Sequence, residues 1–224
     1  MCGRYSLITD IRELANRFDF RVEGLTYQAR FNIAPAQQVL TVTKDGSHNQ
    51  AKLMQWGLIP SWTKDPYFGN RMINARAETI SEKPMFREAF LKSRCLVIAD
   101  GFYEWKKVGK GRIPMRIVLK SGEPFGFAGL QETWKSPDGE EIQSCTIITT
   151  TPNDIMESIH NRMPVILSRE AEGFWLDSAR RELGALQGLL VPYESAAMDV
   201  YAVSTLINSP KNDTPDVIAR NARI

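Results

Sequence analysis

The sequence predicts an α+β fold in which a curled, mostly antiparallel, barrel-like β-sheet is flanked by short helices. Closely spaced apolar strand patterns, separated by tight polar turns, fill the middle of the chain and favour a sheet that curls toward a barrel. Helical periodicity occurs only in short, separate segments. Because the 224 residues contain no linker or internal repeat, we expect a single domain over residues 1–224.

The first third of the chain predicts a helix, a hairpin and a long loop. Thr9-Asp10 can cap a short helix that ends near Phe18, because apolar residues recur at helical spacing after them. Two strand patterns, residues 38–42 and 52–56, are separated by a polar turn and are expected to pair. Residues 57–71 combine glycine, proline and aromatic side chains without periodicity, which is typical of a binding loop.

Strands dominate the centre of the chain, after a helix predicted over residues 84–93. Turns containing glycine or proline separate five strand patterns, so neighbouring strands are expected to pair antiparallel. These patterns cover residues 95–99, 102–106, 113–119, 125–133 and 142–149.

The last third alternates short helical and extended patterns. The expected elements are a helical turn at 152–159, a strand at 163–167, a helix at 183–190 and a strand at 200–206 before a polar tail. Thr151 is expected to cap the first of these, and Ser168 is expected to begin a further helix.

Composition and charge exclude several classes of protein. With 43% hydrophobic and 24% charged residues, the chain has the composition of neither a disordered nor a membrane protein, and charges interrupt its start where a signal peptide is apolar. Three cysteines without regular spacing argue against a disulfide framework or a zinc site and fit a reducing cytoplasm. We expect a cytoplasmic monomer with no metal, no cofactor and no association with membranes.

Cys2 directly follows the initiator methionine. Removal of Met1 would leave one residue with both a free α-amine and a thiol, whose reference pKa values are about 8 and about 8.5. An aldehyde could form an imine with the nitrogen and then close onto the sulfur as a thiazolidine. The alternative is that Cys2 is a small residue at a frayed end. Cys95 and Cys145 lie in apolar strand patterns and are expected to be inert.

Glu104 and His160 are the candidates for proton transfer. Strand alternation places Glu104 on the same face as Phe102 and opposite Trp105, and desolvation by large aromatics would raise the pKa of its carboxyl toward that of a general acid. The alternative is a rim position on an edge strand. His160 lies at an irregular junction where an imidazole could titrate near neutrality, whereas His48 lies in a polar turn and is expected to be solvated.

Asn74 and Arg76 are two residues apart in an extended segment, which places both side chains on one side. The amide could orient a nucleophile, and the guanidinium could hold a phosphate. An ordinary surface pair between Arg76 and Glu78 is the alternative.

Cationic and aromatic side chains are interleaved along the chain. This mixture suits single-stranded nucleic acid, because guanidinium groups contact phosphates and exposed rings stack on unpaired bases. The net charge of +2 neither demands nor excludes such a partner. The candidates are Arg4, Arg71, Arg76, Arg162, the cluster Lys106, Lys107, Lys110 and Arg112, and the aromatics Trp56, Trp62, Tyr67 and Phe68. Trp56 could equally belong to the core.

Six segments, taken in order, resemble the SOS response-associated peptidase (SRAP) family. They are 1–4 (MCGR), 31–35 (FNIAP), 56–62 (WGLIPSW), 73–79 (INARAET), 99–105 (ADGFYEW) and 159–164 (IHNRMP), and the resemblance continues through residues 203–208. It implies one SRAP domain with a barrel-like sheet, and a sensor of abasic sites in single-stranded DNA that bonds covalently to them. The peptidase activity would be self-processing that exposes Cys2.

The resemblance also implies roles for individual residues. Cys2 would be the nucleophile, Asn74 would orient its amine, and Glu104 and His160 would move protons. Five further residues would contact the DNA strand. They are Arg4, Arg76 and Arg162 at the flanking phosphates, and Pro35 and Trp62 beside the lesion, where Tyr67 or Phe68 could replace Trp62.

Two other functions stay open at the level of the sequence. Class II glutaminase domains also begin Met-Cys-Gly, and in such an enzyme Cys2 would attack a side-chain amide with the free amine as base. The length of the chain and its later motifs fit that enzyme poorly. The other alternative is a non-catalytic, single-stranded nucleic-acid-binding module in which Cys2 has no role.

Overall fold

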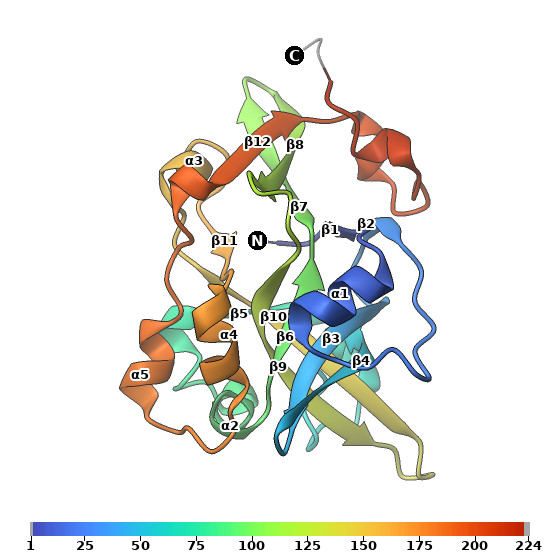
Figure 1. Cartoon of the computed structure of the whole chain (residues 1–224), viewed down its shortest axis with the longest axis vertical. Helices are drawn as coiled ribbons and strands as arrows, with labels where there is room; N and C mark the ends of the chain where they lie inside the picture. Colours follow the sequence, from blue (N-terminus) through green and yellow to red (C-terminus); the bar gives the residue numbers. More distant parts are fainter. Residues whose placement is uncertain (1, 222–224) are drawn as a thin grey trace.

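Two β-sheets form the body of the molecule, and short helices lie around them (Figure 1). This computed structural model describes residues 2–221. The architecture confirms the predicted α+β fold with a curled, mostly antiparallel sheet and short flanking helices.

One sheet closes on itself. Strands β3 (Gln38–Asp45) and β4 (His48–Trp56) form the predicted hairpin, and β6 (Arg94–Ala99) pairs with β3. Strand β9 (Phe125–Lys135) pairs with β6, and β10 (Glu141–Thr150) pairs with both β9 and β4. The ring β10-β4-β3-β6-β9 is therefore a closed five-stranded barrel, in which only the β4–β10 pairing is parallel.

Two short strands extend the barrel where β10 runs beyond its pairing with β4. Strand β5 (Asn74–Arg76) lies parallel to β10, and β11 (Met163–Pro164) lies antiparallel to it. Thr149 of β10 is the register partner of Arg76 on one side and of Pro164 on the other. This pairing brings the 73–79 and 159–164 segments to the same end of β10.

The second sheet is antiparallel throughout and carries the start of the chain. Its order is β12 (Met198–Ala202), β8 (Gly111–Leu119), β7 (Gly101–Val108), β1 (Tyr5–Leu7) and β2 (Arg30–Ile33). Figure 1 shows β1 in the middle of the molecule, beside β7.

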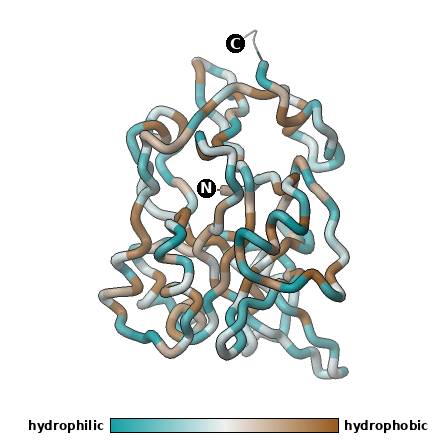
Figure 2. The backbone as a smooth tube through the Cα atoms, in the orientation of Figure 1, coloured by the Kyte–Doolittle hydropathy of each residue, from teal (hydrophilic) through white to brown (hydrophobic). Residues whose placement is uncertain are grey.

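The core fills the barrel and the space between the sheets. Tyr5 packs edge-on against Trp56, with ring centroids 5.2 Å apart, and against Phe127 at 5.9 Å. Trp56 is thus a core residue, and Cys95 and Cys145 are fully buried, as predicted. Hydrophobic segments (brown) concentrate in the central strands of Figure 2, and hydrophilic segments (teal) concentrate in outer loops.

Short helices connect the strands, and none within residues 2–221 has the length and apolar character of a bilayer-crossing helix. Asp10 caps the first helix by accepting from Arg12 N, and Ser168 caps the fourth by accepting from Ala171 N, as predicted. The α-helices are α1 (Ile11–Phe18), α2 (Pro84–Lys92), α3 (Asp154–Glu157), α4 (Arg169–Leu176) and α5 (Leu183–Gly188). The 3₁₀ segments are η1 (Pro66–Arg71), η2 (Ala77–Thr79), η3 (Ser195–Ala197), η4 (Thr205–Asn208) and η5 (Pro215–Val217).

Three local predictions were wrong in detail. Asn153, rather than Thr151, caps α3, because its side chain accepts from Met156 N. The strand predicted over 163–167 is limited to β11, with one isolated bridge at Ile166. The last strand begins at Met198 and ends at Ala202, before η4.

The predicted polar tail also folds back onto the second sheet. The carboxylate of Asp213 accepts hydrogen bonds from Phe31 N at 2.6 Å and Asn32 N at 2.9 Å, and Val217 is fully buried. A local pattern could not predict this, because the partners are more than 180 residues apart in the sequence.

Candidate active site at the start of the chain

Cys2 is fully buried in the apolar core. The chain before β1 follows β7, since Tyr103 N donates to Arg4 O at 3.0 Å. A frayed end, the sequence alternative, is therefore wrong for Cys2. Burial raises the pKa of the Cys2 thiol, and the neighbouring carboxylate of Glu104 raises it further. The thiol is consequently protonated at neutral pH.

Glu104 lies on β7 and is only 3% exposed. Its neighbour Phe102 packs in the main core with Cys2, whereas Tyr103 belongs to a separate cluster that includes Trp105. This separation matches the predicted alternation along β7 and excludes the alternative that Glu104 lies at the rim of an edge strand. Burial raises the pKa of Glu104 to about 7, so its carboxyl exchanges a proton near neutrality.

Asn74 begins β5 and presents an acceptor inside the protein. Its Nδ2 donates to Ile73 O at 2.9 Å, and the same carbonyl accepts from Trp56 Nε1 at 2.9 Å, which fixes β5 against the barrel core. The Oδ1 atom of Asn74 is buried and has no hydrogen-bond partner in the described part of the chain. Such an oxygen is costly to leave unpaired, by about 1–3 kcal/mol. It is therefore a built-in acceptor for a donor that enters the site.

His160 follows α3 and is half-buried. Its Nδ1 accepts a hydrogen bond from Arg162 N at 3.1 Å, which leaves the proton of the neutral ring on Nε2. Burial lowers the pKa of His160, and the positive charges of Arg112 and Arg162 act in the same direction. The lowered pKa favours the neutral ring, whose remaining proton lies on Nε2.

Two of the predicted phosphate-binding arginines already hold parts of the fold. Arg4 Nη1 donates to Asn32 Oδ1 at 2.8 Å and to Ile207 O at 2.6 Å, and its guanidinium lies 5.9 Å from the ring centroid of Trp105. These contacts fix the direction of Arg4 while occupying only one of its nitrogen atoms.

Arg162 forms a bidentate ion pair with Glu78, at 2.6 and 3.0 Å, and donates to Thr149 O at 2.5 Å. The sequence alternative paired Glu78 with Arg76 instead, and that alternative is wrong. Arg76 is the last residue of β5 and is exposed. Arg76 and Arg162 thus lie at the same end of β10, where Thr149 is the register partner of Arg76.

The predicted stacking residues lie on two loops. Pro35 is half-buried and precedes Ala36, whose φ of 66° is uncommon for a residue with a side chain. Trp62 is 63% exposed and Tyr67 is 76% exposed. Phe68 supports Trp62 edge-on, with ring centroids 6.0 Å apart. Trp62 and Tyr67 are therefore the exposed rings of this group, and Phe68 packs against Trp62.

Sequence reasoning missed a buried polar network behind β1. The Asp100 carboxylate accepts from Ser6 Oγ at 2.7 Å and from Thr9 N at 3.1 Å, and it pairs with Arg116 at 3.3 Å. A Cβ on Gly101 would lie 2.8 Å from the Arg116 guanidinium, so a larger residue there would require the Arg116 side chain to shift. No local pattern around Asp100 and Gly101 identifies these partners, because Ser6 and Arg116 come from other segments of the chain.

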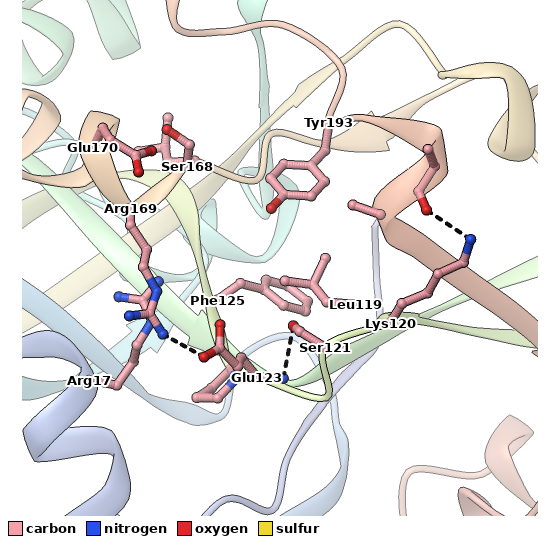
Figure 3. Close-up of a pocket in the computed structure, with 14 residues that line it drawn as sticks. Arg17, Leu119, Lys120, Ser121, Glu123, Phe125, Ser168, Arg169, Glu170 and Tyr193 are labelled. Carbon is pink, nitrogen blue, oxygen red and sulfur yellow. Dashed lines mark hydrogen bonds and ion pairs between the residues drawn. The ribbon is translucent and has the colours of Figure 1, made fainter.

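A pocket elsewhere on the surface of residues 2–221 lacks a comparable constellation. A pocket of about 450 Å³ lies between the β8–β9 turn and the start of α4 (Figure 3). Its Arg169 pairs with Glu123 at 2.7 Å, its Lys120 donates to Ala196 O at 2.8 Å and its Arg17 pairs with Glu172 at 2.8 Å, so these three cations are occupied within the fold. Among residues 2–221 no group of three or more His, Cys, Asp or Glu side chains could hold a metal ion.

Comparison with known proteins identifies the family. The protein-family model described as SOS response associated peptidase (SRAP) matches residues 1–210 of this chain. The chain belongs to the SRAP family. The extension of the domain to residue 224 stays a prediction.

Curated relatives share the family and a common description. The abasic site processing protein YoqW of Bacillus subtilis is 50% identical over 222 residues, which cover 97% of this chain and 99% of YoqW. YedK of Escherichia coli, also named an abasic site processing protein, is 33% identical and covers 79% of each chain. HMCES of Xenopus tropicalis carries the same description and is 32% identical, over 86% of this chain and 66% of its own.

A solved structure from Bacteroides thetaiotaomicron has the same fold. Its TM-score is 0.88 at 29% sequence identity, covering 98% of this chain and 100% of the other. A second, from Bordetella bronchiseptica, has a TM-score of 0.78 at 25% identity over 91% of this chain and 100% of its own.

Proposed function

We propose that this SRAP protein senses abasic sites in single-stranded DNA and becomes joined to them covalently through Cys2. The observation that carries the proposal is the burial of Cys2 beside Glu104, a carboxyl whose pKa lies at about 7. The descriptions of the relatives as abasic site processing proteins support the choice of lesion.

The first step is attack of the Cys2 α-amine on the aldehyde carbon of the opened deoxyribose. Asn74 Oδ1 accepts a hydrogen bond from the amine and orients it, and the Glu104 carboxylate takes the proton that the ammonium form must lose. Protonated Glu104 then returns that proton to the departing oxygen, so that one water leaves and a protonated imine forms. A carboxyl with a pKa at about 7 suits both halves of this exchange.

The second step closes the ring. The thiol of Cys2 adds across the carbon–nitrogen double bond, forming a carbon–sulfur bond, and its proton ends on the nitrogen. Because burial raises the pKa of the thiol, the amine reacts first and the sulfur traps the product. His160, with its proton on Nε2, donates to the ring oxygen of the closed sugar and assists its opening.

The strand is positioned by the side chains around this centre. Arg4, Arg76 and Arg162 hold the flanking phosphates, and Pro35 with Trp62 fills the gap left by the missing base. A single strand requires no unpairing, and an abasic site has no base to unstack. Phosphate contacts therefore position the DNA, while ring closure makes the complex durable.

The reaction requires a free amine on Cys2. Met1 lies outside the described residues, so its removal belongs to the proposal. Self-processing would hydrolyse the Met1–Cys2 peptide bond, and an intact-mass measurement of the purified protein shows whether Met1 has left.

The test mixes protein of verified N-terminus with a single-stranded oligonucleotide that contains one abasic site. We expect an adduct that survives heat and detergent on a denaturing gel. Cys2→Ala should lose this adduct, while Cys145→Ala, which removes a thiol that is equally buried in the barrel, should keep it. Equal crosslinking by Cys2→Ala would contradict the proposal, and release of ammonia from glutamine without an adduct would favour the amidotransferase reading.

A further inference from the structure

The hairpin formed by β7 and β8 carries an unusual excess of positive charge. No acidic residue occurs between Glu104 and Glu123, whereas four cations lie close together near the hairpin tip. These four, which we call the basic arm, are Lys106, Lys107, Lys110 and Arg112. Within residues 2–221 no ion pair joins any of them to a carboxylate.

The geometry of the hairpin places these charges against one another. Lys107 and Arg112 are direct cross-strand partners, and both are exposed. Like charges in that position destabilise an antiparallel pair. The connection is a two-residue turn with φ of 57° at Gly109, which suits a tight hairpin, so the arm is a defined structure. The hairpin keeps Lys107 and Arg112 together although their charges repel each other. This arrangement indicates an anionic partner, outside the chain, that neutralises them.

The basic arm lies on the strand that carries Glu104, and Lys107 faces the side of β7 on which Trp105 and Arg4 lie. Lys107 lies two residues beyond Trp105, on the same face of β7, and the Arg4 guanidinium lies over the Trp105 ring. At roughly 3.4 Å per residue, Lys107 is roughly 10 Å further along the strand than Glu104. The positive charge of Arg112 also lowers the pKa of His160. Figure 1 shows the hairpin extending from the centre of the molecule past β12.

We propose that Lys107 and Arg112, supported by Lys106 and Lys110, bind the phosphodiester backbone of the single strand on one side of the lesion. This inference rests on the proposed function, because it continues the phosphate track that begins at Arg4. A flexible strand can follow the row of cations from the site to the hairpin tip, and its phosphates relieve the repulsion between Lys107 and Arg112.

The test compares Lys107→Gln/Arg112→Gln with Lys44→Gln/Lys83→Gln, a control that removes two exposed cations, one on β3 and one at the start of α2. The probe is a labelled single strand with a tetrahydrofuran abasic analogue, which lacks an aldehyde and therefore binds without crosslinking. We expect the arm variant to bind on the order of 10-fold more weakly than the parent at about 0.1 M salt. The slope of log K against log salt should be smaller in magnitude by about 1.4, which is about 0.7 for each of two lost phosphate contacts. The control should match the parent.

Shortening the probe locates the contacts. Removal of nucleotides from one side of the analogue should abolish the difference between parent and arm variant, and removal from the other side should preserve it. An unchanged salt slope, an equal loss in the control, or a difference that persists after both truncations would overturn the inference. Failure of the parent to crosslink a true abasic site would instead refute the proposed chemistry, and the non-covalent comparison would still decide the role of the arm.

Discussion

Glu104 shows how one buried residue gains its chemistry from its surroundings. Alternation along β7 places it on the core face, where desolvation raises the pKa of its carboxyl to about 7. That environment could be predicted from the sequence, because the flanking aromatics are its immediate neighbours. The contacts of Arg4 with Asn32 and Ile207 could not, because those partners come from distant segments.

The raised pKa of Glu104 predicts a dependence of stability on pH. Between its ordinary value of 4.5 and about 7 the folded protein holds a proton that the unfolded chain has released, so the free energy of unfolding falls as pH rises through this window. The loss should be about 3 kcal/mol at most, from about 1.4 kcal/mol per pKa unit. Urea unfolding of Glu104→Gln, measured from about pH 4.5 to about pH 7.5, should lack this decline.

A matched control is Glu141→Gln, which removes an exposed carboxylate from β10. It should keep the decline of the parent. Equal pH dependence in the parent and in Glu104→Gln would show that Glu104 does not titrate in this window.

At the scale of elements, β1 is the strand that presents Cys2, and it is fixed on several sides. It pairs with β7 and β2, and the network of Asp100, Ser6 and Arg116 lies behind it. The hairpin β3–β4 and the cap of α1 could be predicted from local patterns. The placement of β1 between β7 and β2 could not, because three residues are too few to carry a periodic pattern.

The close approach at Gly101 predicts a specific loss. In Gly101→Ala the new Cβ would lie 2.8 Å from the Arg116 guanidinium, which is itself buried and paired with Asp100. The free energy of unfolding should fall by about 1–3 kcal/mol through overpacking, and crosslinking should slow because β1 shifts. Gly111→Ala on β8, where the nearest atom is 3.7 Å away, should change the free energy of unfolding by less than about 1 kcal/mol in the same denaturant titration. Equal effects of both variants would contradict the role of the network.

At the scale of the whole molecule, the fold joins distant parts of the chain around the site. The barrel closes through the parallel pairing of β4 with β10, and β5 and β11 extend β10 so that Asn74 and the 159–164 segment share one end. A barrel-like sheet could be predicted from the spacing of the strands. Its closure could not, because parallel pairing of distant strands leaves no local signal.

The C-terminal segment predicts a long-range stabilising contact. Asp213→Ala would remove the acceptor for Phe31 N and Asn32 N and the ion-pair partner of Arg30. The free energy of unfolding should fall by about 1–3 kcal/mol, because two backbone donors would lose their partner. Asp216→Ala, which removes a nearby exposed carboxylate, serves as the control in urea unfolding. If Asp213→Ala were as stable as that control, the C-terminal segment would not stabilise β2.

The central claim is that Cys2, as the first residue of the mature chain, condenses with the abasic sugar. The most direct measurement is the intact mass of the crosslinked product, followed by peptide mapping of the attachment point. The account predicts the mass of the protein without Met1 plus that of the oligonucleotide, less one water, with the attachment on Cys2. An adduct that retains Met1, or that maps to any other residue, would contradict it.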